Sequence, residues 1–365
     1  MSNWRKYLKN LLGKRTNRKI VVIESDDWGG IRMPSKKAFD ALLSQGDRVD
    51  NCHFNRFDSL ENESDLNALS EVLKSVKDKV GRPAVVTANY NIANPDFEKI
   101  ENSNFEAYHF ERFTETYKRF YPSENILGLT NELKEEKVFY PQLHGREHLN
   151  PDLWLQLLRD GNEDLKKAFQ VGSYGLSFNT SPSIRVPYLA SLLYKNDSQK
   201  KNVETSIIEG ASIFKYEFGY RSTSFIAPLY YWHADLESTM KQAGIEFLQG
   251  GDRQTQFDEK NKRIFHKLGE KNKWGQTYLV RNVAFELSGY NKETVLKSAM
   301  KEIEIAFTMR KPAVICSHRV NFMGGIVEEN RKENLAYLKR LLEEIVRKWP
   351  EVEFMNSEEL GRLMS

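Results

Sequence analysis

Short apolar runs alternate with amphipathic helical segments along almost the whole chain. The apolar runs, which we expect to form strands, are residues 19–24, 84–87, 138–143, 223–227, 246–248, 278–281, 313–316 and 353–355. Segments with helical periodicity are residues 34–44, 64–80, 151–158, 294–309 and 328–347. This alternation predicts a parallel sheet with helices outside it. With about eight strands in 365 residues, an α/β fold of the distorted (β/α) barrel type, with seven to eight strands, is favoured over an open sheet.

Residues 160–220 fit this alternation least well. Their pattern is mainly helical, which predicts an insertion or a cap on the barrel. No low-complexity linker or internal repeat divides the chain, so we expect a single domain over residues 1–365. Residues 1–19 form a separate basic N-terminal segment, with seven basic residues and no acidic one.

Composition excludes several classes of protein. The net charge of +3 does not predict nucleic-acid binding. Cys52 and Cys316 are too few for a disulfide framework and too far apart for a zinc ribbon, so two reduced thiols are expected. No apolar run reaches the ~18 residues of a membrane-spanning helix. The N-terminus lacks the apolar core of roughly 7–15 residues that a signal peptide needs. These features favour a cytoplasmic protein.

The N-terminal segment also places four apolar residues near one helical face, namely Trp4, Leu8, Leu11 and Leu12. A basic amphipathic helix of this kind can lie on a membrane surface. The alternative, which we favour, is a helix that docks on the domain.

Two adjacent aspartates, Asp26 and Asp27, follow the first apolar run. In α/β barrels the carboxyl ends of the strands form the active site. Two carboxylates there can divide the work between metal binding and proton transfer, because their surroundings set their pKa values apart. Aspartate is also common in turns and helix caps, so the pair alone does not distinguish a site from a turn.

Histidines follow two further expected strands. His144 and His148 stand four residues apart after residues 138–143, and a helix start at Asn150-Pro151 follows them. Neutral imidazoles suit zinc and similar metals. His318 follows residues 313–316, although a lone histidine is more often structural than catalytic.

The expected strand at residues 223–227 leads into a proline and an aromatic cluster, Pro228 to Trp232. Aromatic rings stack on sugars at the mouth of a site, and they equally fill ordinary cores.

In this order and at these strand ends, the chain resembles the polysaccharide deacetylase superfamily, of the chitooligosaccharide and peptidoglycan deacetylase type (NodB homology). That family consists of metal-dependent carbohydrate esterases on a distorted (β/α) barrel. The residues that match its motifs are Asp26-Asp27 (first motif), His144 and His148 (second), residues 226–228 (third, in part) and residues 316–318 (last). The resemblance covers residues 20–320, with divergent motifs.

The departures from the family pattern concern the supports of the site. Glu24-Ser25 replaces the usual Thr-Phe before the aspartates, and Gly145 replaces a serine or threonine of the metal loop. The arginine of the third motif, which normally holds the catalytic aspartate, is missing; Arg32, Arg146 and Arg319 are candidates to replace it. The Asp-x-x-Asp-Trp type motif has no direct match, and residues 281–286 are the nearest segment.

The resemblance and the residue chemistry together imply a mechanism. Asp27, His144 and His148 would hold one divalent metal, zinc in the first place, with cobalt, nickel or manganese as alternatives. Asp26 would act as general base and His318 as general acid.

Substrate contacts are expected from Trp28, Arg146, Pro228, Tyr230 and Trp232. Residues 87–91 could add polar contacts. Glu24, Glu147 and Glu286 are candidates to orient the metal-binding histidines.

The predicted function is therefore that of a hydrolase removing an N- or O-linked acetyl group from a carbohydrate, in surface-polysaccharide metabolism. Two alternatives stay open: a carbohydrate-binding pseudoenzyme, which the missing arginine favours, and a metal-dependent glycosidase, which would need two carboxylates flanking a sugar. The sequence predicts no oligomeric state.

Overall fold

The computed structural model describes residues 7, 9–256 and 262–365. The strands are β1 (Ile20–Trp28), β2 (Val86–Asn91), β3 (Ala93–Pro95), β4 (Phe110–Arg112), β5 (Phe139–Gly145), β6 (Ser224–Ile226), β7 (Phe247–Gly250), β8 (Arg253–Gln256), β9 (Lys262–Phe265), β10 (Thr277–Val280), β11 (Val283–Ala284), β12 (Ala313–His318) and β13 (Glu353–Met355). The α-helices are α2 (Lys36–Ser44), α3 (His53–Phe57), α4 (Glu63–Ser75), α5 (Phe97–Asn102), α6 (Phe113–Phe120), α7 (Ile126–Glu135), α8 (Pro151–Arg159), α9 (Glu163–Gln170), α10 (Asp197–Phe218), α11 (Glu237–Gln242), α12 (Lys292–Thr308), α13 (Glu328–Lys348) and α14 (Ser357–Met364).

A curled parallel sheet runs through the molecule, in the order β10-β7-β6-β5-β2-β1-β12-β11, with β13 paired to the start of β1. Every pairing in this sheet is parallel. The edge strands β10 and β11 are not paired to each other among the described residues, and Arg281 and Asn282 join them along the chain. The fold is thus the α/β distorted (β/α) barrel that the sequence predicts.

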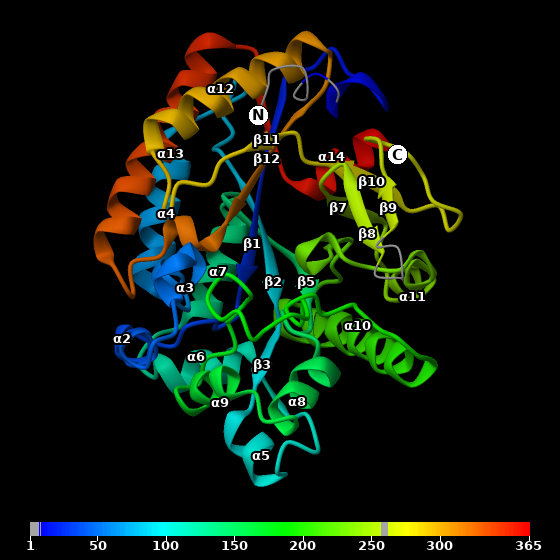
Figure 1. Cartoon of the computed structure of the whole chain (residues 1–365). Helices are drawn as coiled ribbons and strands as arrows, with labels where there is room; N and C mark the ends of the chain where they lie inside the picture. The colour runs from blue at the N-terminus through cyan, green and yellow to red at the C-terminus, as the bar shows by residue number, and fades with distance from the viewer. Residues whose placement is uncertain (1–6, 8, 257–261) are drawn as a thin grey trace.

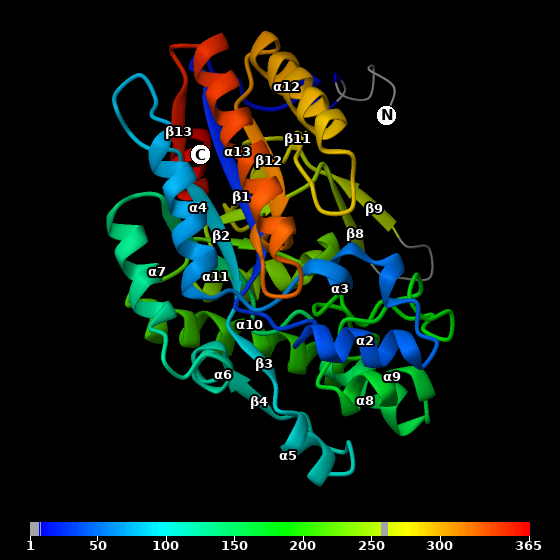
Figure 2. The ribbon, with the colours of Figure 1, turned by 90° about the vertical axis from the view of Figure 1, so that its left-hand side faces the viewer.

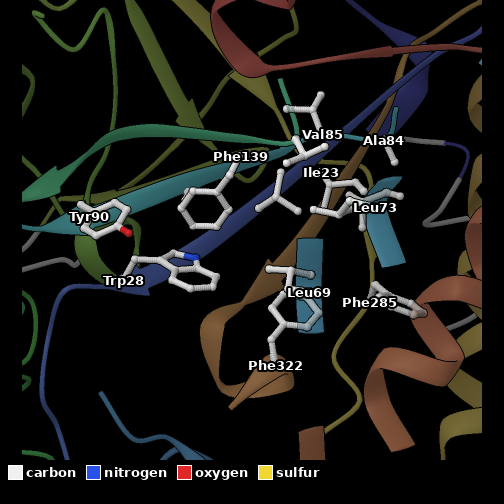
Figure 3. Packing of buried hydrophobic residues seen from close by; sticks show 14 of the residues in the cluster. Ile23, Trp28, Leu69, Leu73, Ala84, Val85, Tyr90, Phe139, Phe285 and Phe322 are labelled. Carbon is white, nitrogen blue, oxygen red and sulfur yellow. The ribbon is translucent and has the colours of Figure 1, made fainter. Parts of the chain in front are cut away.

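Helices pack outside the sheet, and apolar side chains fill the space between. Figures 1 and 2 show α4, α12 and α13 along one flank, where α13 contacts both α4 and α12. Figure 3 shows part of this core, in which Leu69 and Leu73 of α4 lie near Ile23 of β1. The carboxyl ends of β1, β2 and β5 point towards the end of the molecule where α8, α9 and α10 lie (Figure 1).

All eight expected strands are present, and several continue further than expected. β1 extends to Trp28 and β12 to His318, so both aspartates and His318 belong to strands. The pairs β3–β4 and β8–β9 form small separate hairpins. The predicted helical insertion is correct for α9 and α10, whereas residues 171–196 between them are irregular.

Helix starts follow the capping signals, with one correction. Asn150 caps α8 through Leu153 N–H and Pro151 occupies its first turn, as the sequence predicts. The cap of α4 is Asn62, which forms a reciprocal capping box with Asp65, and the helix does not start at Ser64.

The last part of the N-terminal segment is hydrogen-bonded to the barrel. Lys311 Nζ donates hydrogen bonds to the carbonyl oxygens of residues 12, 13 and 14, each at 2.7 Å. Leu11 and Leu12 are exposed, and Trp4 and Leu8 of the expected helical face lie outside the described residues. None of the helices in the described ranges is both long and apolar enough to cross a membrane. Cys52 and Cys316 are free thiols, as predicted.

Candidate active site with a metal-binding triad

Asp26 and Asp27 lie near the carboxyl end of β1. β1 pairs with β12 so that Asp26 lies opposite His318, and with β2 on its other side. Asp27 has a φ of 76°, a left-handed conformation that costs a non-glycine residue about 1–2 kcal/mol. Such strain persists where the surroundings hold it in place, and it gathers at functional sites. The strand therefore ends in a turn that directs the two neighbouring carboxylates to different partners.

Asp27, His144 and His148 converge, as the sequence predicts for a metal site. Asp27 Oδ1 lies 3.3 Å from His144 Nε2 and 3.2 Å from His148 Nε2. One ligand atom from each of the three residues lies within 4.8 Å of the others, and all three side chains are buried. Arg32 Nη2 donates to the other oxygen of Asp27, Oδ2, at 3.1 Å. Burial raises the pKa of Asp27 and the neighbouring charge of Arg32 lowers it, and the pKa lies well below its usual value.

The hydrogen bonding of His144 shows what this triad lacks. Its Nδ1 lies 2.9 Å from the carbonyl oxygen of Ile226. A carbonyl can only accept, so Nδ1 carries the proton and a neutral ring presents a bare lone pair at Nε2. That lone pair faces the oxygen lone pairs of Asp27 Oδ1, which has no hydrogen-bond donor among the described residues. Two acceptors at this distance repel unless a cation lies between them. The residues present therefore fit a metal ion.

His148 is also buried, although its Nδ1 has no hydrogen-bond partner among the described residues. Burial lowers the pKa of His148 to about 4, which keeps its imidazole neutral at physiological pH. Two neutral imidazoles and one carboxylate are the donor set of catalytic zinc sites, which keep a further position open.

The other aspartate, Asp26, is held by an arginine that the sequence analysis did not propose for this role. Arg281 Nη1 donates to Asp26 Oδ2 at 2.6 Å and Nη2 donates to Oδ1 at 2.7 Å. Asn89 Nδ2 donates to Oδ1 at 2.8 Å, and Arg281 Nε donates to the buried Glu24 at 2.5 Å. Burial raises the pKa of Asp26, but Arg281 outweighs it and the pKa is lowered. Asp26 is thus an ionised acceptor in a fixed orientation.

His318 faces Asp26 from the next strand. Its Nε2 lies 3.7 Å from Asp26 Oδ2, and its Nδ1 lies 2.5 Å from Glu286 Oε1. Burial lowers the pKa of His318, but the charge and hydrogen bond of Glu286 outweigh it, so the pKa lies well above its usual value. His318 is accordingly a protonated imidazolium beside an ionised carboxylate, which is an acid next to a base.

Close backbone packing fixes the loop that carries the two metal-site histidines. Gly145 has a φ of 152°, which disfavours the serine or threonine of the family pattern. Helix α10 crosses this loop at Gly210, where an added Cβ would lie 3.2 Å from the backbone nitrogen of Arg146. The insertion of residues 160–220 therefore supports the site.

The arginines and carboxylates proposed as supports take other positions. Arg32 contacts Asp27, Arg319 pairs with Asp58 and Glu61, and Arg146 pairs with Glu147 and Glu209. None of these three holds Asp26 in the structure. Glu24, Glu147 and Glu286 do not orient the histidines of the triad: Glu24 binds Arg281, Glu147 binds Arg146 and Glu286 binds His318. The partner of His144 is a backbone carbonyl.

The expected substrate platform is not formed by the residues named for it. Trp28 is completely buried, donates Nε1–H to Ser25 and packs edge-on against Phe139 at 4.8 Å (Figure 3). Trp232 is buried with Nε1 directed at Glu237, and Pro228 is buried as well. These three expectations are corrected, because a buried ring cannot stack on a sugar.

Tyr230 differs from the other aromatic residues. Its hydroxyl lies 3.3 Å from Arg281 Nη1 and 3.7 Å from the sulfur of Cys316, so the ring borders the pair of Arg281 and Asp26. Arg146 directs its guanidinium away from Asp27 and towards Glu209 on α10. Of the five residues expected to contact substrate, Tyr230 is the one that borders Arg281 and Asp26.

Sequence reasoning missed Arg281 and gave Glu286 a different partner. The segment 281–286, identified only as the nearest counterpart of a missing motif, supplies one side chain to Asp26 and another to His318. The available signal was its position after an apolar strand. Asn89, from the segment expected to add polar contacts, binds Asp26.

No family model matches the chain, and no curated protein matches it in sequence. Among solved structures, it is similar to 4-alpha-glucanotransferase from Thermococcus litoralis, with 11% identity and a TM-score of 0.46 over 94% of this chain, which spans 40% of the length of that chain.

Two further similar structures have names that relate to the family which the motifs resemble. One is a Mycobacterium smegmatis protein provisionally named a polysaccharide deacetylase, with 9% identity and a TM-score of 0.46 over 97% of this chain and 94% of that chain. The other is a family 4 acetyl xylan esterase from Clostridium thermocellum in complex with a cobalt ion, with 10% identity and a TM-score of 0.35 over 94% of this chain and 91% of that chain. At these identities, function has to be inferred from the site itself.

Proposed function

We propose that this chain is a divergent, metal-dependent hydrolase of the polysaccharide deacetylase type, which removes an acetyl group from a carbohydrate. The observation that carries the proposal is the buried triad, in which Asp27 Oδ1 lies 3.3 Å from His144 Nε2 and 3.2 Å from His148 Nε2. The acid–base pair of His318 and Asp26 lies beside it.

Asp27, His144 and His148 would hold one divalent metal. Zinc suits the two imidazoles and one carboxylate best, and cobalt, nickel and manganese accept the same donors. When bound, such a cation supplies Lewis acidity towards water and towards the acyl carbonyl.

The remaining residues divide the proton transfers. Asp26 Oδ2 accepts the proton of the attacking water, and Arg281 and Asn89 keep the carboxylate aimed during that step. His318 Nε2 donates a proton to the departing amine or alcohol, and Glu286 keeps the imidazole charged until then. Arg281 lowers the pKa of Asp26 and so makes this carboxylate a weaker base. A weak base suits a water molecule whose own pKa a bound cation would lower.

The main rival is a carbohydrate-binding pseudoenzyme. Its support in the sequence was the missing arginine of the third motif. Arg281, which comes from a different strand end, donates two hydrogen bonds to Asp26 and so can hold this carboxylate in place of the missing arginine. This contact supports a catalytic protein over a binder.

The decisive experiment joins metal analysis to an acetate-release assay. The purified protein is analysed for bound metal and incubated with N-acetylated glucosamine oligomers and with acetylated xylan oligomers, with and without a chelator. We expect one metal per chain, chelator-sensitive acetate release, and loss of turnover but not of metal in Asp26→Asn. The exposed Asp40→Asn is the matched control. Chelator-insensitive release by metal-free protein would refute the proposal.

A further inference from the structure

A cavity of about 610 Å³ lies between α8, α10, the β3–β4 hairpin and the loop after β5. That volume is within the ~300–1,000 Å³ typical of small-molecule sites. Figure 1 shows α8 and α10 next to each other at the carboxyl end of the sheet. The closed region beside Asp27 and His148 is lined by different residues, so the two are separate spaces.

The lining of this cavity is mainly polar. Amide and hydroxyl side chains dominate it, among them Gln156, Ser198 and Thr205. Its charged residues are two basic and three acidic ones, namely Arg146, Arg159, Glu106, Asp152 and Glu209. Arg146 pairs with Glu209, and Asp152 accepts hydrogen bonds from Asn202. Such a surface offers many hydrogen bonds and no excess of positive charge. It does not suit a phosphate or another anion, and it suits a ligand rich in hydroxyl groups.

Two buried polar groups in the wall lack a partner. The hydroxyl oxygens of Tyr108 and Ser191 are buried and make no hydrogen bond within the described part of the chain. Ser191 is 5% exposed. Both residues line the cavity, and a buried hydroxyl without a partner is unfavourable until a ligand or a water molecule supplies one. Beside them the guanidinium of Arg146 lies over the ring of Phe110, at 4.6 Å, and forms a flat wall.

We infer that this cavity is a second binding site, which takes a neutral oligosaccharide and is separate from the triad. Arg146 connects the cavity with the triad. It lies between His144 and His148 in the chain, and its side chain lines the cavity. A bound glycan therefore rests against the back of the metal loop. The inference does not depend on the proposed deacetylation, because the residues that line the cavity take no part in it.

The test measures glycan binding without turnover. Full-length Asp26→Asn protein, freed of metal by a chelator, is titrated calorimetrically with chitotetraose, N-acetylchitotetraose, xylotetraose and maltotetraose. We expect at least one to bind, and Thr205→Trp, which fills the cavity from α10, to weaken that binding by about tenfold or more. Ser212→Trp is the matched control, since Ser212 is also exposed on α10 and does not line the cavity; its affinity should stay that of the parent.

Three results would overturn the inference. The first is that none of the four tetrasaccharides binds. The second is that Thr205→Trp and Ser212→Trp bind equally well. The third is that His148→Ala abolishes binding while Thr205→Trp leaves it intact, which would place the glycan at the triad. Circular dichroism of each variant confirms that it is folded.

Discussion

Arg281 donates hydrogen bonds to Asp26 from both terminal nitrogens of its guanidinium, at 2.6 and 2.7 Å. The two residues are 255 positions apart in the chain. The Nε of Arg281 binds Glu24 at 2.5 Å, so one arginine binds two buried carboxyl groups. This contact both fixes the proposed base and stabilises the carboxyl end of β1.

Replacing Arg281 should therefore separate orientation from stability. In Arg281→Lys the charge remains but the two-pronged geometry is lost, so kcat should fall by about 10- to 100-fold with the fold retained. In Arg281→Gln both carboxylates lose their counter-ion, and we expect destabilisation of about 3–5 kcal/mol. Steady-state kinetics and denaturant unfolding measure the two effects. Equal kcat in Arg281→Lys and the parent would remove Arg281 from the mechanism.

The triad predicts that metal binding stabilises the fold. A ligand that binds only the native state stabilises it by about 2.7 kcal/mol at 100 times its Kd. Zinc added to metal-free protein should thus raise Tm, and it should not do so in His148→Ala, when each variant is compared with its own metal-free form. His109→Ala, a histidine outside the triad, should respond as the parent does. A zinc response that survives in His148→Ala contradicts the assignment of the ligands.

The contact of His318 with Glu286 predicts the alkaline limit of activity. Glu286 raises the pKa of His318, and the proton on His318 is needed for leaving-group departure, so activity should fall as the pH rises through that pKa. Glu286→Gln removes the charge and should move this fall to lower pH. The pH profile of kcat/KM measures the displacement. Glu293→Gln, at an exposed ion pair with Arg340, serves as control. An unmoved alkaline limit in Glu286→Gln would exclude His318 as the acid.

Local sequence patterns predicted the strands and the residues at their ends. The apolar runs predicted eight of the nine strands of the main sheet and missed β11. Parallel topology brings the carboxyl ends of the strands together, which is why the sequence alone could group Asp27, His144 and His148. The supports could not be predicted in this way. Whether Arg281 reaches Asp26 depends on the curl of the sheet between β10 and β12, and neither segment encodes that by itself.

The aromatic residues show a second limit of prediction from the sequence. Trp28 and Trp232 lie next to the site in sequence, and a tryptophan after a strand end suits both a sugar platform and a core. Burial decides between these roles, and it is set by neighbours such as Phe139 and His266 from other parts of the chain. Sequence therefore predicted the convergence of Asp27, His144 and His148 better than it predicted the surroundings of the aromatic residues.

The crossing of α10 over the metal loop gives a last prediction. At Gly210 an added Cβ would lie 3.2 Å from the nitrogen of Arg146, so Gly210→Val must push the loop that carries His144 and His148. Since metal ligands need precise placement, zinc affinity should fall by about tenfold or more, with α10 still formed. Ser212→Val, two residues further along the same helix and exposed, is the matched control and should bind zinc as the parent does. Competition with a chromogenic chelator measures the affinities. If Gly210→Val binds zinc with the affinity of the parent, then α10 does not position the metal loop, and the insertion serves only to enclose the cavity beside it.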